Sequence, residues 1–314
     1  MELQAVFDLL RTTLELGLIT SLTVLALFLS YSMLNVCDLS TDGCFTLGAA
    51  VGAVVALSGH PVLSIFAAMG AGMISGLVTS LLQTKMGIDS LLSGIIVNTG
   101  LYSINIAVMK NSSLVNLNKT ETIFTMAKRA LENSFLASSY KLVVIIVAVA
   151  LVVAFLVFFL RTRLGLAIRA TGNNPAMVKS SSINPVYTTI VGLVIANAFT
   201  GLSGCLMAQS QKSANIDIGG GIVTIALASL LIGNAFLGKG SILKRAIGAV
   251  AGSIIFRCVY TIALRLKMPA SMLKLVSSII VIIAIAGPYF RAQIPMIKRK
   301  MALKKGRENG REEQ

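Results

Sequence analysis

Two carboxylates, Asp38 and Asp42, stand four residues apart in the run Asp-Leu-Ser-Thr-Asp-Gly, directly before an apolar stretch. On a helix this spacing places them on one face, where the pair could bind a metal ion or the ammonium group of a substrate. The run could instead be a solvated loop in which Ser40, Thr41 or Asp42 caps the helix that begins near Cys44. Charges beside an apolar segment are costly and often functional, so both interpretations stay open.

A buried cation is a second candidate. Arg257 lies inside the apolar segment Ile242–Leu264, and its distance from Arg245 corresponds to ~18 Å along a helix. An arginine at this depth indicates a functional site, unless Asp89 or a neighbouring carbonyl group neutralises it.

A polar stripe marks one further apolar segment, Leu91–Met109. Asn98, Tyr102 and Asn105 follow one another at intervals of four and three residues, so they share one helix face. Such a face contacts a cavity or another helix rather than lipid, which predicts either a substrate path or hydrogen bonds between helices. Phe45 could add an aromatic wall to a path.

Neither a resident metal nor another cofactor is expected. The run Gly233–Ser241 nearly matches a phosphate-binding loop, but Gly240 occupies the position of the magnesium-binding hydroxyl and no aspartate follows Asp217. His60 is the single histidine, so it cannot complete a Cys/His zinc set. The cysteines show no paired spacing and are expected to be free thiols: Cys37, Cys44, Cys205 and Cys258.

The elements that position these groups follow from composition. Of 314 residues, 55% are hydrophobic and 12% are charged, whereas a soluble domain carries about 25% charged residues. Two apolar segments, Cys44–Ser58 and Ile222–Phe236, are short and glycine-rich, so we expect broken or re-entrant helices there. The sequence predicts an all-α polytopic membrane protein with about 8–10 transmembrane helices, including these broken or re-entrant segments. The nine candidate segments are Thr13–Ser32, Cys44–Ser58, Val62–Leu82, Leu91–Met109, Leu142–Leu160, Tyr187–Met207, Ile222–Phe236, Ile242–Leu264 and Met272–Tyr289.

Glycine spacing predicts how these helices pack. Three pairs separated by three residues allow close backbone approach, and packing within one subunit is favoured over a dimer seam. The pairs are Gly48 with Gly52, Gly72 with Gly76, and Gly248 with Gly252. We expect one transmembrane domain over residues 1–290, with a cytoplasmic loop at about 161–185, and a basic cytoplasmic tail over residues 291–314.

The charge distribution excludes one class of function and orients the chain. The 27 basic and 12 acidic residues give a net charge of +15, but the basic residues cluster between apolar segments, which is typical of cytoplasmic loops and not of a nucleic-acid-binding surface. Arg161–Pro185 has four basic residues and no acidic one, so we place it inside the cell. The tail from Arg291 is also placed inside, facing anionic membrane lipids. Lys110–Lys141 is then external, although its five basic and two acidic residues weakly oppose the rule.

Three stretches carry a family resemblance that covers nearly the whole chain. Arg161–Pro185 resembles the cytoplasmic coupling loop of bacterial ABC importer permeases of the branched-chain amino acid/ribose class, with the form basic-x-basic-x-G-x-x-x-[RK]-A and then a short helix. Ser182 stands where glycine is common in the turn after that helix. Leu39–Ala49 and Ala226–Gly252 resemble the early and late glycine-rich stretches of the class. The Asp-Leu-Ser-Thr-Asp-Gly-Cys-Phe version is most similar to the tryptophan/tyrosine transport permeases.

The resemblance implies a permease subunit of a bacterial cell membrane and no enzyme activity of its own. Its partners would be cytosolic ABC ATPase subunits, an extracellular or periplasmic substrate-binding protein and a second permease copy in a homodimer. Thr171 or Asn173 would cap the short helix of the loop, with Pro175 in its first turn. The expected ATPase contacts are Gly172, Asn173, Asn174, Pro175, Met177 and Val178.

The implied solute is an aromatic amino acid, and other small solutes stay open: a branched-chain amino acid, a sugar, a nucleoside or a vitamin. A polar path for such a solute would draw on Asp42, Phe45, Asn98, Tyr102, Asn105 and Arg257. Two rivals remain. One is a membrane-embedded metal-dependent transferase that uses Asp38 and Asp42, and the other is a passive channel.

Overall fold

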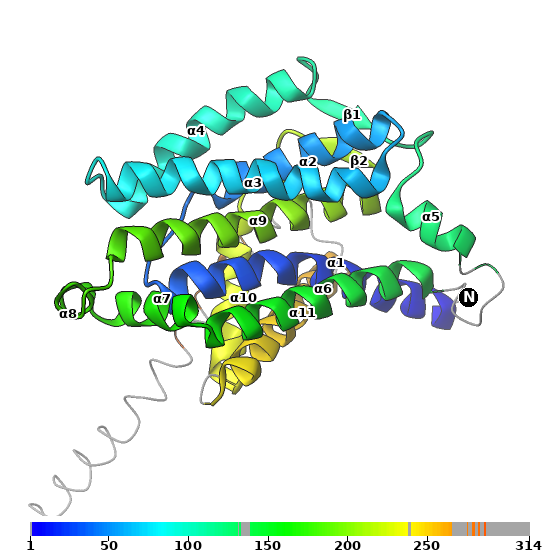
Figure 1. Cartoon of the computed structure of the whole chain (residues 1–314). Coiled ribbons are helices and arrows are strands. Elements are labelled where there is room, and N and C mark those ends of the chain that lie inside the picture. Colours follow the sequence, from blue (N-terminus) through cyan, green and yellow to red (C-terminus); the bar gives the residue numbers. More distant parts are fainter. Residues whose placement is uncertain are drawn as a thin grey trace, which may run out of the picture.

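The chain forms a bundle of helices. The computed structural model describes residues 2–130, 132, 139–237 and 240–265, together with five single residues further on (275, 278, 279, 282 and 286). Figure 1 shows most long helices lying side by side along one axis. In chain order the elements are α1 (Glu2–Leu27), η1 (Phe28–Met33), α2 (Thr41–Leu57), α3 (Pro61–Thr84), α4 (Ser90–Val108), β1 (Leu114–Asn116), α5 (Ile123–Ala130), α6 (Tyr140–Arg161), α7 (Arg163–Asn173), α8 (Pro175–Ser180), α9 (Pro185–Gln211), β2 (Ser213–Asn215), α10 (Ile222–Leu237) and α11 (Ile242–Arg265).

The all-α polytopic class is confirmed. Eight of the nine predicted apolar segments form helices. Of the ninth, Met272–Tyr289, the structure describes five single residues, and the tail 291–314 lies outside the described residues. Within the described ranges six helices are long and apolar enough to cross a membrane, and α2 and α10 are shorter. The two short helices are uninterrupted, so neither is broken in the way that the glycine-rich sequence allowed, and Gly43 lies in the first turn of α2. The break precedes it, at residues 34–40.

Close backbone contacts hold α2 and α3 against α9. A methyl group on Gly48 would lie 2.2 Å from the carbonyl oxygen of Gly201, and one on Gly72 would lie 2.2 Å from that of Asn197. These distances are far below van der Waals contact, so only glycine allows the approach. The glycine pairs of α2 and α3 therefore pack within one subunit, as predicted.

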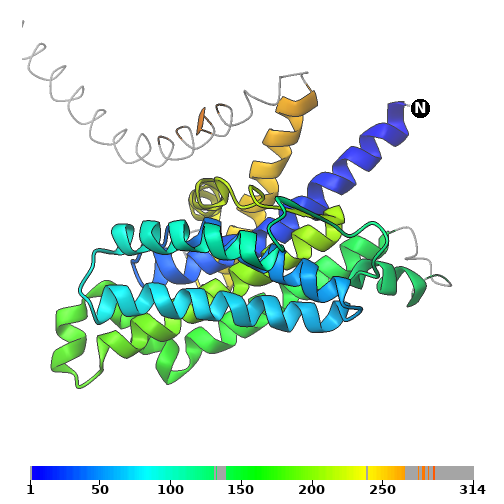
Figure 2. The same cartoon turned by 90° about the horizontal axis from the view of Figure 1, so that it is seen from above.

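The short helix α10 runs across the bundle rather than along it (Figures 1 and 2). It packs on α11 by the same device, since a methyl group on Gly252 would lie 2.0 Å from the carbonyl oxygen of Ser229, and one on Gly233 would lie 2.2 Å from that of Gly248. Gly233 opens the run that nearly matches a phosphate loop, whose residues 238 and 239 lie outside the described part. Four residues of that run, 234–237, continue α10 as helix.

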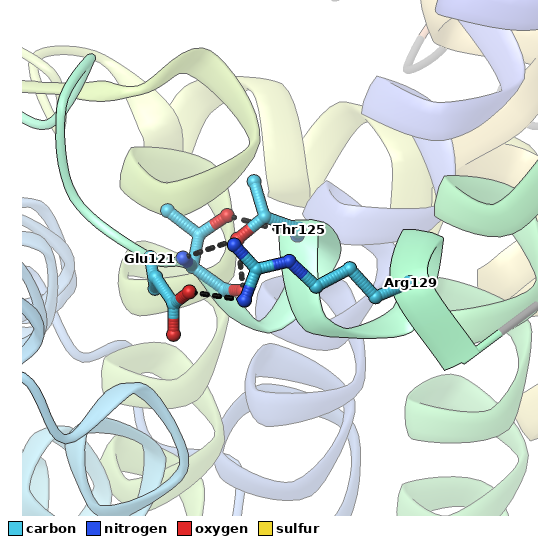
Figure 3. A network of polar contacts seen from close by, with 4 residues as sticks. Glu121, Thr125 and Arg129 are labelled. Carbon is cyan, nitrogen blue, oxygen red and sulfur yellow. Dashed lines mark hydrogen bonds and ion pairs between the residues drawn. The ribbon is translucent and has the colours of Figure 1, made fainter. Parts of the chain in front are cut away.

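One end of the bundle carries a small folded cover. Strands β1 and β2 pair antiparallel, with Val115 opposite Ala214, and α5 follows β1. Thr122 caps α5, since its hydroxyl accepts from the Thr125 amide at 3.3 Å while the Thr125 hydroxyl accepts from the Thr122 amide at 2.8 Å. Figure 3 shows Arg129 reaching back to form an ion pair with Glu121 beside this cap. The segment Lys110–Lys141 is thus structured over its described residues.

Candidate substrate path and coupling helix

Asp38 is buried in the break between η1 and α2, with 1% of its surface exposed. One carboxylate oxygen accepts hydrogen bonds from the Ser40 amide at 2.8 Å and the Ser40 hydroxyl at 2.6 Å. The other accepts from the side-chain amide of Asn197 at 2.7 Å. Asn197 is near the middle of α9, roughly 18 Å from its first residue. Three donors therefore hold a carboxylate at about mid-depth of a spanning helix.

Asp42 has a different partner, so the two aspartates do not share a helix face. Its side chain accepts from the amides of Gly221 at 3.0 Å and Val223 at 2.8 Å. Asp42 thus caps the N-terminus of α10, where free amide groups and the helix dipole favour a negative charge. This arrangement differs from both interpretations of the sequence, a metal-binding pair with Asp38 and a cap of the helix to which Asp42 itself belongs. No cluster of three or more metal-binding side chains occurs among the described residues.

A glycine run makes the cap possible. A methyl group on Gly219 would lie 2.2 Å from the carbonyl oxygen of Asp42, so the chain before α10 rests directly on the first turn of α2. Gly221 adopts a φ of +84°, a left-handed conformation that favours glycine. The sequence contains one signal for such a cap. The run Gly219-Gly-Gly221 precedes an apolar helix and offers no side chain that could cap it, so the cap must come from a distant segment.

The polar stripe of α4 divides between two environments. Asn105 is buried and donates its side-chain amide to the carbonyl of Gly43 at 3.2 Å. Asn98 is half-buried beside the same glycine, since a methyl group on Gly43 would lie 2.6 Å from its side-chain oxygen. Tyr102 is 53% exposed. The stripe therefore serves helix packing at two positions and leaves one aromatic hydroxyl on the surface of the subunit.

The remaining two path candidates differ in accessibility. Phe45 is completely buried in the main hydrophobic core, so a solute reaches its ring only if the helices move. Arg257 places its guanidinium 5.3 Å from the ring centroid of Tyr260. The expected partner Asp89 instead caps α4, where its side chain accepts from the Leu91 amide at 2.9 Å.

The predicted coupling loop consists of two helices, α7 and α8. Asn174 caps α8 by accepting from the amides of Ala176 and Met177 at 3.1 Å each, and Pro175 occupies the first turn as predicted. The predicted caps are wrong, because Asn173 ends α7 and the Thr171 hydroxyl bonds that of Thr188 at 2.8 Å.

Most of α8 faces outward. Met177 is 64% exposed, while Val178 is 2% exposed and anchors the helix to the bundle. In Figure 1, α8 lies beyond the ends of α7 and α9. After it, Ser182 adopts a φ of +61°, in the left-handed region. The turn thus has the backbone conformation that favours glycine, although a serine occupies it.

Two buried amides escaped the sequence reasoning. Asn197 binds Asp38, and Gln209 donates to the Ser64 hydroxyl at 2.6 Å while its side-chain oxygen accepts from the Ile123 amide at 2.9 Å. Both lie inside the apolar helix α9. Polar side chains within a spanning helix seldom face lipid. This rule, applied to the polar residues of α9, predicts that both amides are buried in contacts with other elements.

The fold defines a class, the polytopic α-helical membrane proteins. In the part of the chain that the structure describes, six helices long and apolar enough to span a membrane enclose polar groups at mid-depth, and a short, exposed helix extends from one end. Residues 9–285 match the family of branched-chain amino acid transport system permease components. The chain belongs to this family of transport components. It is therefore a multi-pass protein of a bacterial inner membrane, as expected from the sequence.

Individual relatives agree with the family. The chain is 33% identical to a tyrosine transport system permease protein of Clostridioides difficile (strain R20291), over 86% of this chain and 88% of the relative. It is 28% identical to an uncharacterized protein of Rickettsia prowazekii (strain Madrid E), over 89% and 98% of the two chains. It is 29% identical to a D-allose transport system permease protein of Escherichia coli (strain K12), over 64% and 63%. No solved structure matches the chain.

Proposed function

We propose that this chain works as a homodimer with cytosolic ABC ATPase subunits and an external substrate-binding protein, and that it imports an aromatic amino acid. The observation that carries the partner assignment is the exposed helix α8, held at the end of the bundle by one buried side chain, Val178. Most of this short helix is exposed to solvent, so contacts within the subunit do not explain why it is both capped and anchored. A docking partner supplies that reason.

The charges support a cytosolic position for α8. One end of the bundle holds α8 and the α3–α4 turn (Figure 1). The two segments at this end, residues 85–89 and residues 161–185, together carry five basic residues and one acidic residue. The opposite end, which holds the start of α1, residues 110–141 and residues 212–221, carries seven basic and six acidic residues. The α8 end therefore carries the larger net positive charge, +4 against +1, and it is the cytosolic end by the positive-inside rule.

Cysteine labelling tests this orientation. In a background without the four native cysteines, a cysteine at Asn118 is expected to react with an impermeant thiol reagent in intact cells, and one at Ser180 only after lysis. Both positions are exposed. Labelling of Ser180→Cys in intact cells would reverse the orientation. Cysteines at positions 134, 138 and 309 would test the same orientation, and these positions lie outside the described residues.

ATPase docking is tested on α8 itself. We expect affinity-purified wild-type chain from its native membranes to carry ATP-hydrolysing activity, and Met177→Asp to lose it, because a charge replaces an apolar contact. Met86→Asp is the matched control, since Met86 is 69% exposed in the α3–α4 turn at the same end of the bundle. Retained ATPase activity with Met177→Asp, or its absence with the wild type, contradicts the proposal.

The solute assignment rests on the similarity to the tyrosine permease. A zwitterionic amino acid needs polar partners along an apolar path, and Asn98 and Tyr102 supply them from one helix. We assign these two residues to the path, with Arg257 and its Tyr260 contact as a further candidate. Asp42, Phe45 and Asn105 contribute by holding the first turns of α2 in place.

Uptake separates the possible solutes. Cells that express the importer are expected to accumulate labelled tyrosine, with competition by phenylalanine and not by leucine or allose. Asn98→Leu should lower uptake about tenfold without changing ATPase copurification, since one polar partner in the path is lost. Competition by leucine or allose instead would assign another solute, and unchanged uptake by Asn98→Leu would remove this residue from the path.

A further inference from the structure

A continuous set of close contacts leads from the coupling helices to the buried Asp38. It begins at Gly172 in the last turn of α7. A methyl group on Gly172 would lie 2.0 Å from the carbonyl oxygen of Met33 and 2.9 Å from the Cα atom of Leu34. The backbone of α7 therefore rests directly on the end of η1, with no side chain between them.

Leu34 is confined from a second side. A methyl group on Gly192 of α9 would lie 2.3 Å from its Cδ1 atom, and Leu34 itself is 4% exposed. The hydroxyl groups of Thr171 and Thr188 join α7 to α9 at 2.8 Å beside this contact. Because packed interiors are nearly incompressible, α7 cannot move toward or along the bundle without displacing Leu34.

The chain after Leu34 has a defined shape. Helix η1 is a π-helix, in which the Leu34 amide donates to the Leu29 carbonyl at 3.2 Å, and such wide turns are frequent at functional sites. Asn35 has a φ of +56°, in the left-handed region that asparagine adopts more readily than most other residues with a side chain. Three residues then connect Leu34 to Asp38, and the four Cα-to-Cα steps span at most ~14 Å.

The end of this set is a hydrogen bond that a small displacement would break. The Asp38 carboxylate accepts from Asn197 at 2.7 Å, and a hydrogen bond of this kind is lost beyond about 3.5 Å. A displacement of roughly 1 Å at Asp38 therefore breaks it, and the charge must then find another donor. Small shifts at the surface can thus switch a polar group at mid-depth.

We propose that Leu34 and Asn35, held by Gly172 and Gly192, form a relay that transmits movement of the coupling helices to the Asp38–Asn197 contact. The inference rests on the proposed docking of an ATPase at α8. It assigns these four residues as positioning residues for transport. Asp38 and Asn197 are the switched pair, which opens when α7 is displaced and closes when α7 returns.

Two glycine substitutions test the relay in the assembled importer with its ATPase in proteoliposomes. Gly172→Ala is expected to lower solute uptake per ATP hydrolysed about tenfold, because its methyl group displaces the end of η1. Gly100→Ala is the matched control in α4, since a methyl group there has no neighbour within 4 Å, and it should leave the ratio unchanged. Equal ratios for both variants would overturn the relay.

A second pair of variants tests the relay even if Gly172→Ala does not fold. Asn35→Gly accepts the same backbone conformation and loosens the connection, so uptake per ATP should fall while the protein level stays normal. Asn111→Gly is its control, because Asn111 has a φ of +59° in the Lys110–Lys141 segment, far along the chain from the relay. An unchanged ratio for Asn35→Gly contradicts the proposal.

A double-mutant cycle completes the test. Asp38→Asn combined with Asn35→Gly should be no worse than the poorer single variant, because both act on one connection, whereas independent effects multiply. Multiplied losses would overturn the relay. If the wild type shows no solute-stimulated hydrolysis, the proposed ATPase coupling itself fails. If the wild type is coupled and the variants remain coupled, the relay alone fails.

Discussion

The cap that Asp42 provides for α10 gives a quantitative prediction. Its two carboxylate oxygens accept separately from the amides of Gly221 and Val223. At an ordinary helix cap, asparagine replaces aspartate with little loss because one oxygen is used. Here the amide group of an asparagine would face one of the two N–H donors and leave it without an acceptor.

The expected cost follows from these bonds. A hydrogen bond to a charged group contributes about 1.5–3 kcal/mol to the free energy of unfolding, so Asp42→Asn should lower it by about that amount. Asp42→Ala removes both bonds and should cost roughly twice as much. The negative charge at the helix N-terminus adds about 0.3–1 kcal/mol to either loss.

The assay is denaturant titration of the purified chain in detergent micelles. Asp89→Asn is the matched control, because Asp89 caps α4 through one bond, to the Leu91 amide, at an exposed site. It should change the free energy of unfolding by less than about 0.5 kcal/mol. If Asp42→Asn is as stable as this control, the bidentate cap contributes nothing and the reasoning is refuted. Tyrosine uptake that falls in Asp42→Asn by more than its folded fraction would show a further role for the charge.

Two more substitutions test local geometry by the same titration. Ser182→Gly should raise the free energy of unfolding by about 0.5–1 kcal/mol, because glycine adopts the left-handed turn without strain. Ser181→Gly is the control and should not raise it, because Ser181 lies outside the left-handed region. A lower free energy of unfolding for Ser182→Gly would contradict the left-handed conformation of this turn. Gln209→Leu should lower the free energy of unfolding by about 1–3 kcal/mol for each buried group that loses its hydrogen bond to Gln209. Gln211→Leu, at an exposed position, should leave the free energy of unfolding nearly unchanged. Equal effects of the two substitutions would contradict the role of Gln209 as a bridge.

Much of the fold could be predicted because apolar length is a local property. Segments such as Leu142–Leu160 are too long and too apolar for any other structure, and the structure forms α6 there. Glycine pairs also predicted packing correctly, since close approach depends on the absence of a side chain. The helix caps were harder, because Asn173 and Asn174 are equally suitable by type, and only the position at which α7 ends decides between them.

The partners of the polar groups could not be predicted from spacing. Asp42 lies 179 residues before Gly221, and a helical period says which residues share a face and not which distant segment meets it. The same applies to Asp38, whose partner Asn197 is 159 residues away. Reading the pair as one cluster failed because residues 34–40 are not helical, so the spacing of four residues has no helical meaning there.

The hydrogen bonds within the subunit also limit which polar groups can bind a solute. Asp38 and Asp42 already accept three and two hydrogen bonds within the subunit, so they offer few free lone pairs to an ammonium group unless those contacts open. Asn98 and Tyr102, the proposed path residues of α4, are neutral. Neutral partners make weak contacts with a zwitterion, and a weak site releases its solute readily. Strong interaction would then require opening of the Asp38–Asn197 contact, which ties polar access at mid-depth to movement of the coupling helices.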